Sequence, residues 1–292
     1  MEINPATRIS LCTVRLESYG AKSSSVGTGY CYCFNYPNPE NGNMTLVAAL
    51  VTNKHVVEGA TRLKTEFQII KQGSLIGEDG KAAEEERLLV EFTNLGFEIV
   101  SHPDPAVDLC IILLGRTLNA IKEGYGVKNI FIDRNWHVEE NMKSHVRPIE
   151  PIAMIGYPNG LWDQVNNRPI ARRGQTASHA FMRWNGQRQF VIDAACFPGS
   201  SGSPVFLFED GLFRSGSGYT PGTRAKLIGT LWGGPLINAE GKLVPRAIPT
   251  SLEQDGVEKI PSLQLMMNLG FVVPADALDD FIPLIKLRLG SP

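Results

Sequence analysis

Residues 193–205 read Asp-Ala-Ala-Cys-Phe-Pro-Gly-Ser-Ser-Gly-Ser-Pro-Val, and the rest of the chain is interpreted from this stretch. Ser201 lies in the pattern Gly-x-Ser-Gly-x-Pro, and a strand-like run follows at 205–208. A glycine at 199 lets a backbone N–H turn inward where a side chain would clash. The N–H groups of Gly199 and Ser201 are then able to converge on one point and stabilise a developing oxyanion. The stretch predicts a loop that carries a nucleophilic serine.

Two other interpretations of this loop have to be weighed. The Gly-x-Ser-x-Gly elbow of α/β-hydrolases requires a glycine two residues after the serine and a helix beyond it. Here residue 203 is a serine, and Pro204-Val205-Phe206 suits an extended segment better than a helix interior. An ordinary turn rich in glycine, serine and proline is the second alternative, and the loop alone does not decide between that turn and catalysis.

Histidine and aspartate residues upstream complete a set of three catalytic residue types. Residues 46–57 read as an apolar strand that ends in His55, and residues 108–114 read as an apolar strand opened by Asp108. The chain order His, Asp, Ser is one of the orders in which convergent serine hydrolases carry their triad. Asp104, on the approach to the same strand, is an alternative for the acid.

With these residues in place, the chain resembles a trypsin-like (chymotrypsin-fold) serine peptidase, and it is most similar to the bacterial glutamyl-endopeptidase and Deg/HtrA-like branch. The resemblance implies an all-β fold of two six-stranded antiparallel Greek-key β-barrels with a C-terminal α-helix. It assigns residues 1–115 to a first barrel with His and Asp, 116–147 to a connector, and 148–292 to a second barrel with Ser and the helix. The matching motifs are residues 52–57 (Thr-Asn-Lys-His-Val-Val), 107–109 (Val-Asp-Leu), 155–158 (Ile-Gly-Tyr-Pro), 193–202, 227–234 and 269–274.

The resemblance also implies a role for each site residue. His55, Asp108 and Ser201 are expected to form the catalytic triad, with His55 as the base and Asp108 holding its imidazole. The N–H groups of Gly199 and Ser201 are expected to form the oxyanion hole. The expected substrate-binding residues are Ala195, Cys196, Leu231, Trp232, Gly233 and Gly270.

None of these substrate-binding residues is charged, so the primary specificity pocket is expected to prefer small to medium apolar side chains. Ala195 stands where trypsin has an aspartate, and Leu231 stands where glutamyl endopeptidases have a histidine. An arginine reaching inward, either Arg246 or one of the pair Arg172-Arg173, would instead favour acidic residues. Ser200 replaces the aspartate that captures a new N-terminus in trypsin-type zymogens, so no N-terminal cleavage is expected to be needed for activity.

The leading hypothesis is a serine endopeptidase that acts on a peptide or protein substrate, with a regulatory protein as a further expected partner. A protease fold without activity, used as a binding module or scaffold, is the alternative from another class. An esterase with the same triad is a third hypothesis, because it shares the chemistry.

Composition narrows the function classes. The 292 residues, 43% of them hydrophobic, suffice for a large core in one to two domains. The net charge is −2 and no long run of lysine and arginine occurs, which argues against nucleic acid as a partner. The apolar runs have strand length, which argues against a membrane span. An acid and a proline near Met1 do not suit a signal peptide, so a cytoplasmic location is expected.

The five cysteines form no framework of disulfide spacings and are expected to be small buried residues. Cys31 and Cys33 share one face of a predicted strand, but a zinc site would need a second ligand pair that the sequence lacks. Neither a metal nor a cofactor is therefore expected. About twenty residues follow Gly270 in this sequence, so a PDZ domain like that of Deg-like proteases is not expected.

Hydrophobic patterns give the expected elements. Strands are predicted over 8–16, 27–34, 45–52, 61–70, 88–92, 99–114, 172–181 and 189–193, with one helical turn at 57–60. The polar segment 73–87 is expected to be a solvated hairpin tip, and His137 and His145 are expected at the surface. An amphipathic helix is predicted from 275 onward, with a kink or break at Pro283. Residues 235–268 are an insertion relative to shorter families.

Overall fold

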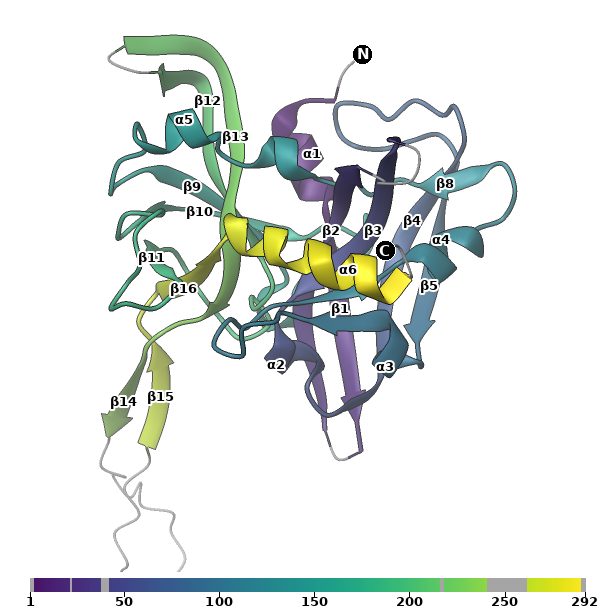
Figure 1. Ribbon diagram of the computed structural model, residues 1–292, viewed down its shortest axis with the longest axis horizontal. Helices are drawn as coiled ribbons and strands as arrows, with labels where there is room; N and C mark the ends of the chain where they lie inside the picture. Colours follow the sequence, from purple (N-terminus) through teal and green to yellow (C-terminus); the bar gives the residue numbers. More distant parts are fainter. Residues whose placement is uncertain (1–2, 22, 38–41, 216–217, 241–261, 290–292) are drawn as a thin grey trace, which may run out of the picture.

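A computed structural model of the chain describes residues 3–21, 23–37, 42–215, 218–240 and 262–289. These residues form two large antiparallel β-sheets that lie side by side and a separate two-stranded ribbon. The last helix, α6 (Phe281–Leu289), passes from the second large sheet across the first (Figure 1). The predicted all-β fold with a C-terminal helix is confirmed.

The first sheet has the strand order β5-β4-β1-β2-β3-β7-β6, and β8 pairs with β4. Within the described residues it therefore holds eight strands instead of the predicted six, because the three-residue strands β6 and β8 are added to it. Its interior is filled by large apolar side chains such as Leu16, Leu50 and Phe67, each fully buried. The strands are β1 (Thr13–Gly20), β2 (Ser24–Pro37), β3 (Met44–Thr52), β4 (Ala60–Lys71), β5 (Glu85–Phe92), β6 (Ile99–Ser101), β7 (Cys110–Leu113) and β8 (Tyr125–Val127).

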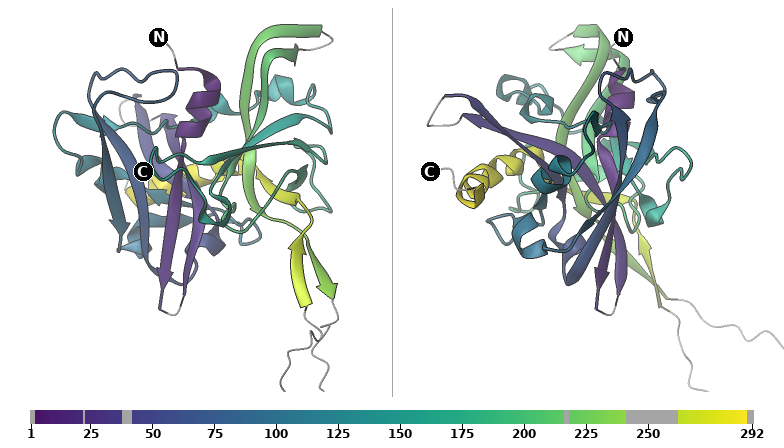
Figure 2. Two further views of the ribbon diagram at one scale, coloured as in Figure 1. Left: turned by 180° about the vertical axis from the view of Figure 1, so that it is seen from behind. Right: turned by 90° about the vertical axis from the view of Figure 1, so that its right-hand side faces the viewer.

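The second sheet closes into the predicted six-stranded barrel, in the order β10-β11-β16-β13-β12-β9. The hairpin of β12 and β13 extends beyond the barrel at one end, and the separate ribbon of β14 and β15 projects at the other (Figures 1 and 2). This ribbon belongs to the predicted insertion. The strands are β9 (Pro151–Gly156), β10 (Ile170–Thr176), β11 (Phe190–Asp193), β12 (Pro204–Ser215), β13 (Gly218–Gly233), β14 (Leu236–Glu240), β15 (Ser262–Met266) and β16 (Leu269–Pro274).

The helices of the described residues are short and connect or cover the sheets. Phe281 and Ile285 of α6 are fully buried against the first sheet, where Phe281 lies edge-on to Phe34. Pro283 was predicted to kink or break the helix, but it lies in the first turn of α6, where it removes no helical hydrogen bond. The change of helix type comes earlier, at Phe281, where the preceding 3₁₀ helix ends and α6 begins. The other helices are α1 (Pro5–Leu11), α2 (Lys54–Val57), α3 (Leu95–Glu98), α4 (Gly115–Asn119), α5 (Glu140–Lys143), and the 3₁₀ turns η1 (Arg134–Trp136), η2 (Pro158–Gly160) and η3 (Ala275–Asp280).

Three local predictions were wrong. Residues 8–11 belong to α1 and not to a strand, because the Asn4 side chain caps the N–H of Ala6 at 2.7 Å and Pro5 occupies the first helical position. The helical turn after β3 begins at Lys54, earlier than predicted. The predicted strand 99–114 is split into β6 and β7 by a loop.

The prediction for His137 was also wrong, since its side chain is buried and not at the surface. Its Nε2 and the Tyr32 hydroxyl form a hydrogen bond of 2.9 Å. Burial, together with the positive charges of Arg134, Lys143 and Lys226, lowers the pKa of His137 to about 3. A pattern of polar neighbours does not reveal such burial, because it results from packing between distant segments. His145 is exposed, as predicted.

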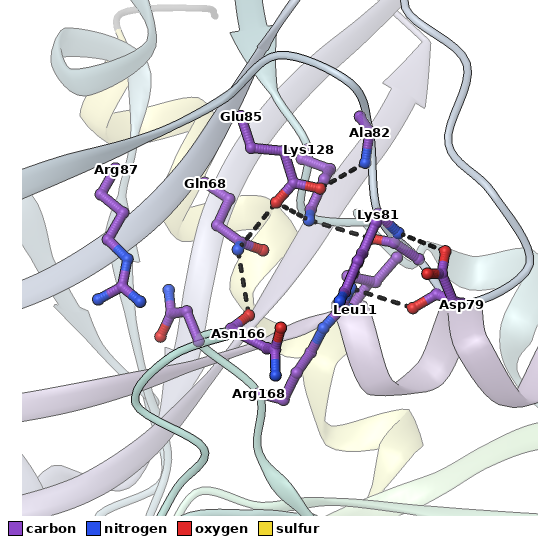
Figure 3. Close-up of polar contacts among 12 residues, drawn as sticks. Leu11, Gln68, Asp79, Lys81, Ala82, Glu85, Arg87, Lys128, Asn166 and Arg168 are labelled. Atoms are coloured by element: carbon purple, nitrogen blue, oxygen red, sulfur yellow. Dashed lines mark hydrogen bonds and ion pairs between the residues drawn. The ribbon is translucent and has the colours of Figure 1, made fainter.

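The polar segment after β4 is exposed for most of its length, as predicted, but one point of it is fixed in a polar network (Figure 3). The buried Lys128 ammonium donates to the Gly80 carbonyl oxygen at 3.0 Å and pairs with Glu85 at 2.7 Å. Arg168, on the segment between β9 and β10, also donates to the Gly80 carbonyl oxygen. The network joins a loop of the first sheet to a loop of the second and so helps to fix how the two sheets pack.

Candidate active site

His55 and Asp108 meet because β3 and β7 are antiparallel neighbours, with Thr52 opposite Cys110. His55 follows the end of β3 within α2, and Asp108 precedes the start of β7. Because the two strands are antiparallel, both residues lie at the same end of the strand pair. The distance from His55 Nδ1 to Asp108 Oδ2 is 2.5 Å, and the backbone N–H of His55 donates to Oδ1 at 3.2 Å. The carboxylate therefore fixes both the ring and the backbone of the histidine.

Asp108 is held in its ionised form. Burial raises the pKa of its carboxyl group, but the hydrogen bonds and charge of His55 outweigh burial and leave the pKa below its ordinary value. An ionised acceptor at Nδ1 requires the proton there, so whenever the ring is in its neutral form its Nε2 lone pair is available as a base. Asp104, the alternative acid, caps the N–H of Ala106 instead, and its carbonyl oxygen accepts from Lys54.

The nucleophile loop, residues 195–203, has a conformation that glycine makes possible. Gly199 has φ +83°, and a Cβ there would lie 2.6 Å from the carbonyl oxygen of Tyr157. The Ser200 N–H donates to the Phe197 carbonyl oxygen at 3.0 Å, which closes a tight turn around Gly199. This turn is fixed from outside, since the Pro198 carbonyl oxygen accepts from the N–H of Asn159 at 2.5 Å.

The same turn orients two N–H groups. In a trans peptide the N–H points away from the C=O, so the N–H of Gly199 points away from Asn159. Within the described residues, neither this N–H nor that of Ser201 donates to any protein group. They are the two donors that the sequence predicts for an oxyanion hole.

The hydroxyl of Ser201 is half-buried and donates to the Trp232 carbonyl oxygen at 3.4 Å. In the part of the chain that the structure describes, it makes no hydrogen bond to His55. Two hydrogen bonds nevertheless connect the two segments. The hydroxyl of Thr52, three residues before His55, donates to the Thr28 carbonyl oxygen, and the Thr28 N–H donates to the Ser201 carbonyl oxygen. Hydrogen bonds between catalytic groups are often long in a structure without substrate and shorten when substrate binds.

Thr28 is a buried residue of this site that sequence reasoning missed. From β2 of the first sheet, its N–H donates to the Ser201 carbonyl oxygen at 2.8 Å and its hydroxyl donates to the Gly199 carbonyl oxygen at 3.1 Å. The hydroxyl also accepts from the N–H of Tyr157 at 3.1 Å. Thr28 therefore holds the nucleophile loop from the opposite sheet. The available signal was its position between Gly27 and Gly29, since glycines inside a strand mark a close approach of another segment.

The predicted substrate-binding residues come from three segments that meet beside this loop. Cys196 and Leu231 are buried, and a Cβ on Gly270 would lie 2.7 Å from Cys196 Sγ and 2.6 Å from Leu231 Cδ1. Ala195 opens the nucleophile loop and is half-buried. Cys196, Leu231 and Gly270 therefore pack directly against one another, and their contact is apolar.

Trp232 and Gly233 lie at the end of β13. Strand β12 pairs with β13 only as far as Thr230, whereas Gly233 still pairs with Phe271 of β16. The edge of Trp232 and Gly233 that faces away from β16 is therefore not covered by β12. The indole of Trp232 is fixed by a 3.0 Å hydrogen bond to Gln189 and by stacking on Phe271.

Of the arginines considered from the sequence, Arg172 reaches inward. Its Nη1 donates to Ser200 Oγ at 2.8 Å and to the Ala195 carbonyl oxygen at 2.7 Å. Arg173 lies over the ring of Phe208 instead. Arg246 lies outside the described residues.

Other candidate chemistry is not assembled in the described residues. No group of three histidine, cysteine, aspartate or glutamate side chains there is arranged to hold a metal ion. All five cysteines are free thiols, four of them buried and Cys33 half-buried. No helix in the described ranges has the length and apolar character needed to cross a membrane.

Comparison with known proteins identifies a family. The model of the trypsin-like peptidase domain matches residues 36–213, more than half of the chain. No sequence among curated proteins matches. The chain is similar in structure to a mutant of the HtrA-type protease AlgW with a tripeptide, at 15% identity and a TM-score of 0.48 over 99% of this chain and 64% of AlgW. The chain thus spans less than two thirds of that protein.

Two further solved structures are similar at the same low level. One is a mutant of Rv3671c from M. tuberculosis H37Rv in an inactive form, with 16% identity and a TM-score of 0.41 over 99% of this chain and 93% of that one. The other is tobacco etch virus protease complexed with product, with 12% identity and a TM-score of 0.45 over 80% of this chain and 72% of that one.

Proposed function

We propose that this chain, which belongs to the family of trypsin-like peptidase domains, is a serine endopeptidase that uses His55, Asp108 and Ser201 as its catalytic triad. The observation that carries the proposal is the 2.5 Å hydrogen bond between His55 Nδ1 and an ionised Asp108. A histidine oriented in this way has its other nitrogen available as a base, which is what a serine nucleophile requires.

The proposed reaction is acyl transfer through an ester on Ser201. Ser201 Oγ attacks the carbonyl carbon of the scissile peptide while His55 Nε2 accepts the hydroxyl proton. The negative charge that develops on the carbonyl oxygen is stabilised by the N–H groups of Gly199 and Ser201. His55 then gives the proton to the leaving amine, which leaves an ester on Ser201. Water, activated by the same histidine, hydrolyses that ester and restores the serine.

The substrate would bind as an extended strand along the uncovered edge of Trp232 and Gly233. The side chain before the scissile bond would then face the uncharged segments that carry Ala195, Leu231 and Gly270, whose close packing leaves little room for a large side chain. These uncharged segments support a preference for small apolar residues, since each buried methylene is worth about 0.8 kcal/mol only where it fits. Arg172, the arginine that reaches inward, makes its hydrogen bonds to the nucleophile loop, and for this reason we do not assign it to an acidic substrate side chain. A lysine or arginine there would be buried without an acidic partner, because residue 195 is alanine.

Labelling with a fluorophosphonate probe tests this proposal. Mass spectrometry should locate the probe on Ser201, and the Ser201→Ala variant should be unlabelled and should cleave no peptide above a small residual rate. Ser25→Ala, which removes an exposed serine from the same fold, is the matched control and should react like the wild type.

Substrates separate the remaining alternatives. A peptide library should be cleaved preferentially after small apolar residues. Labelling with ester hydrolysis but without peptide cleavage would support an esterase. A well-folded chain without any labelling would support an inactive scaffold and refute the proposal.

A further inference from the structure

Arg172 is a half-buried cation that points into the second barrel from β10. Its register partner on β9 is the fully buried Met154. The Nε and Nη2 atoms of Arg172 are buried without a hydrogen-bond partner, and no carboxylate in the described residues forms an ion pair with it. Among the residues that the structure describes, its hydrogen bonds are the two from Nη1 to Ser200 Oγ and to the Ala195 carbonyl oxygen, both in the nucleophile loop.

Stability does not account for such a residue. A buried charge without a charged partner is unfavourable, and burial accordingly lowers the pKa of Arg172. The neighbouring Arg173 is exposed and lies over an aromatic ring, which is the ordinary place for an arginine on a strand. Buried charges are normally paired with an opposite charge, and Arg172 departs from this rule without a gain in stability. Such a departure points to a functional constraint at that position.

The two groups that accept hydrogen bonds from Arg172 lie on either side of Gly199, whose N–H is a predicted oxyanion donor. Ala195 stands at the start of the loop, and Ser200 stands directly before Ser201. Ser200 Oγ also accepts from the N–H of Phe197 at 3.3 Å, so Arg172, Ser200 and the turn form one connected set of hydrogen bonds. Within that turn lies the peptide that carries the N–H of Gly199.

We propose that Arg172 is a positioning residue, whose guanidinium holds the nucleophile loop so that the N–H groups of Gly199 and Ser201 face the same point. The chain thus carries, inside its second barrel, the cation that orders its own loop. The inference rests on the proposed peptidase function, but it concerns the conformation of the loop and not the identity of the triad.

The decisive variant is Arg172→Met, which keeps most of the side-chain volume and removes the charge and the donors. Arg173→Met is the matched control one residue away. We expect Arg172→Met to lose about 100-fold or more in fluorophosphonate labelling rate and in kcat, the size of effect seen when an oxyanion donor is lost. KM should change little, because the peptide edge at Trp232 is not touched. Arg173→Met should stay within about twofold of the wild type.

Three further measurements separate positioning from a merely structural role. The melting temperature of Arg172→Met should be unchanged or higher, since an unpaired buried charge is removed. Amide hydrogen exchange of residues 195–203 should become at least tenfold faster in Arg172→Met and not in Arg173→Met. Added guanidinium should restore part of the labelling rate of Arg172→Ala and none of that of Ser201→Ala.

Several results would overturn the inference. One is a labelling rate in Arg172→Met close to that of the wild type. Another is a parallel fall of melting temperature and labelling rate without rescue by guanidinium. A third is loss of cleavage only after acidic residues, with labelling intact, which would make Arg172 a substrate-binding group. If the wild type itself were unlabelled, the peptidase proposal would fail, and hydrogen exchange would still decide whether Arg172 orders the loop.

Discussion

Replacing Gly199 with alanine would test the nucleophile loop directly. The added Cβ would lie 2.6 Å from the carbonyl oxygen of Tyr157 and 3.2 Å from the N atoms of Asn159 and Gly160. These are backbone atoms, which do not move aside as a flexible side chain would. Relief therefore has to come from rotation of the turn itself, and such a rotation would take the N–H of Gly199 out of the oxyanion position.

The size of the effect follows from separating two contributions. Gly199 has φ +83°, where alanine costs about 1–2 kcal/mol. Gly186 has φ +75° with no atom near its would-be Cβ, so Gly186→Ala incurs the conformational cost alone. Loss of one oxyanion donor costs about 2.7–4 kcal/mol in transition-state stabilisation, or about 100- to 1000-fold in kcat. Only Gly199→Ala should show this second contribution.

The assay is steady-state cleavage of a peptide substrate together with urea unfolding of each variant. Gly199→Ala should lower kcat by about 100- to 1000-fold with a small change in KM, because the interaction is made only in the transition state. Gly186→Ala should lose about 1–2 kcal/mol of unfolding free energy and keep its kcat. If Gly199→Ala kept a third or more of kcat, the N–H of Gly199 would not be an oxyanion donor, and the reasoning about the turn would be refuted.

Two further predictions concern ionisation. Asp108→Asn should lower kcat by about 10⁴-fold at neutral pH, because asparagine favours the wrong tautomer of His55. Asp104→Asn should not lower kcat, and equal effects of the two variants in a kinetic assay would contradict the choice of Asp108 as the acid. His137, with a pKa of about 3 in the folded protein, stays neutral while the unfolded chain takes up a proton below about pH 6.5, so stability should fall as pH falls. Unfolding measured at pH 7 and pH 5 should show about 2 kcal/mol of this loss, absent in His137→Gln and retained in the exposed His145→Gln.

The parts of the site that could be predicted are those encoded in short stretches. Residue type and spacing are enough to recognise three of these stretches. They are the strand before His55, the aspartate just before β7 and the glycines around Ser201. The sheet topology then brings His55 next to Asp108, and not next to Asp104, because β3 and β7 are neighbours. The C-terminal helix was predictable from its own apolar spacing, whereas the closed second barrel was implied by the resemblance to trypsin-like peptidases.

What the sequence does not reveal depends on contacts between distant segments. Thr28 is separated from Ser201 by most of the chain, and only the fold brings the two together. His137 is buried because Tyr32 and its neighbours pack over it, not because of its own polar surroundings. Arg172 was recognised as an arginine that could reach inward, but its partners in the nucleophile loop are set by the curvature of the closed barrel.

The nucleophile loop is held by hydrogen bonds from both sheets, so its conformation depends on how the two sheets pack together. Thr28 contributes from the first sheet, Asn159 from the turn after β9 and Arg172 from inside the second barrel. Each contact fixes a different carbonyl or hydroxyl of the same short loop, so the loss of one leaves the turn around Gly199 under-determined. Such loops open locally at a lower free energy than the whole domain unfolds. Loosening of the packing between the sheets should therefore release Thr28 first and abolish activity before either sheet unfolds.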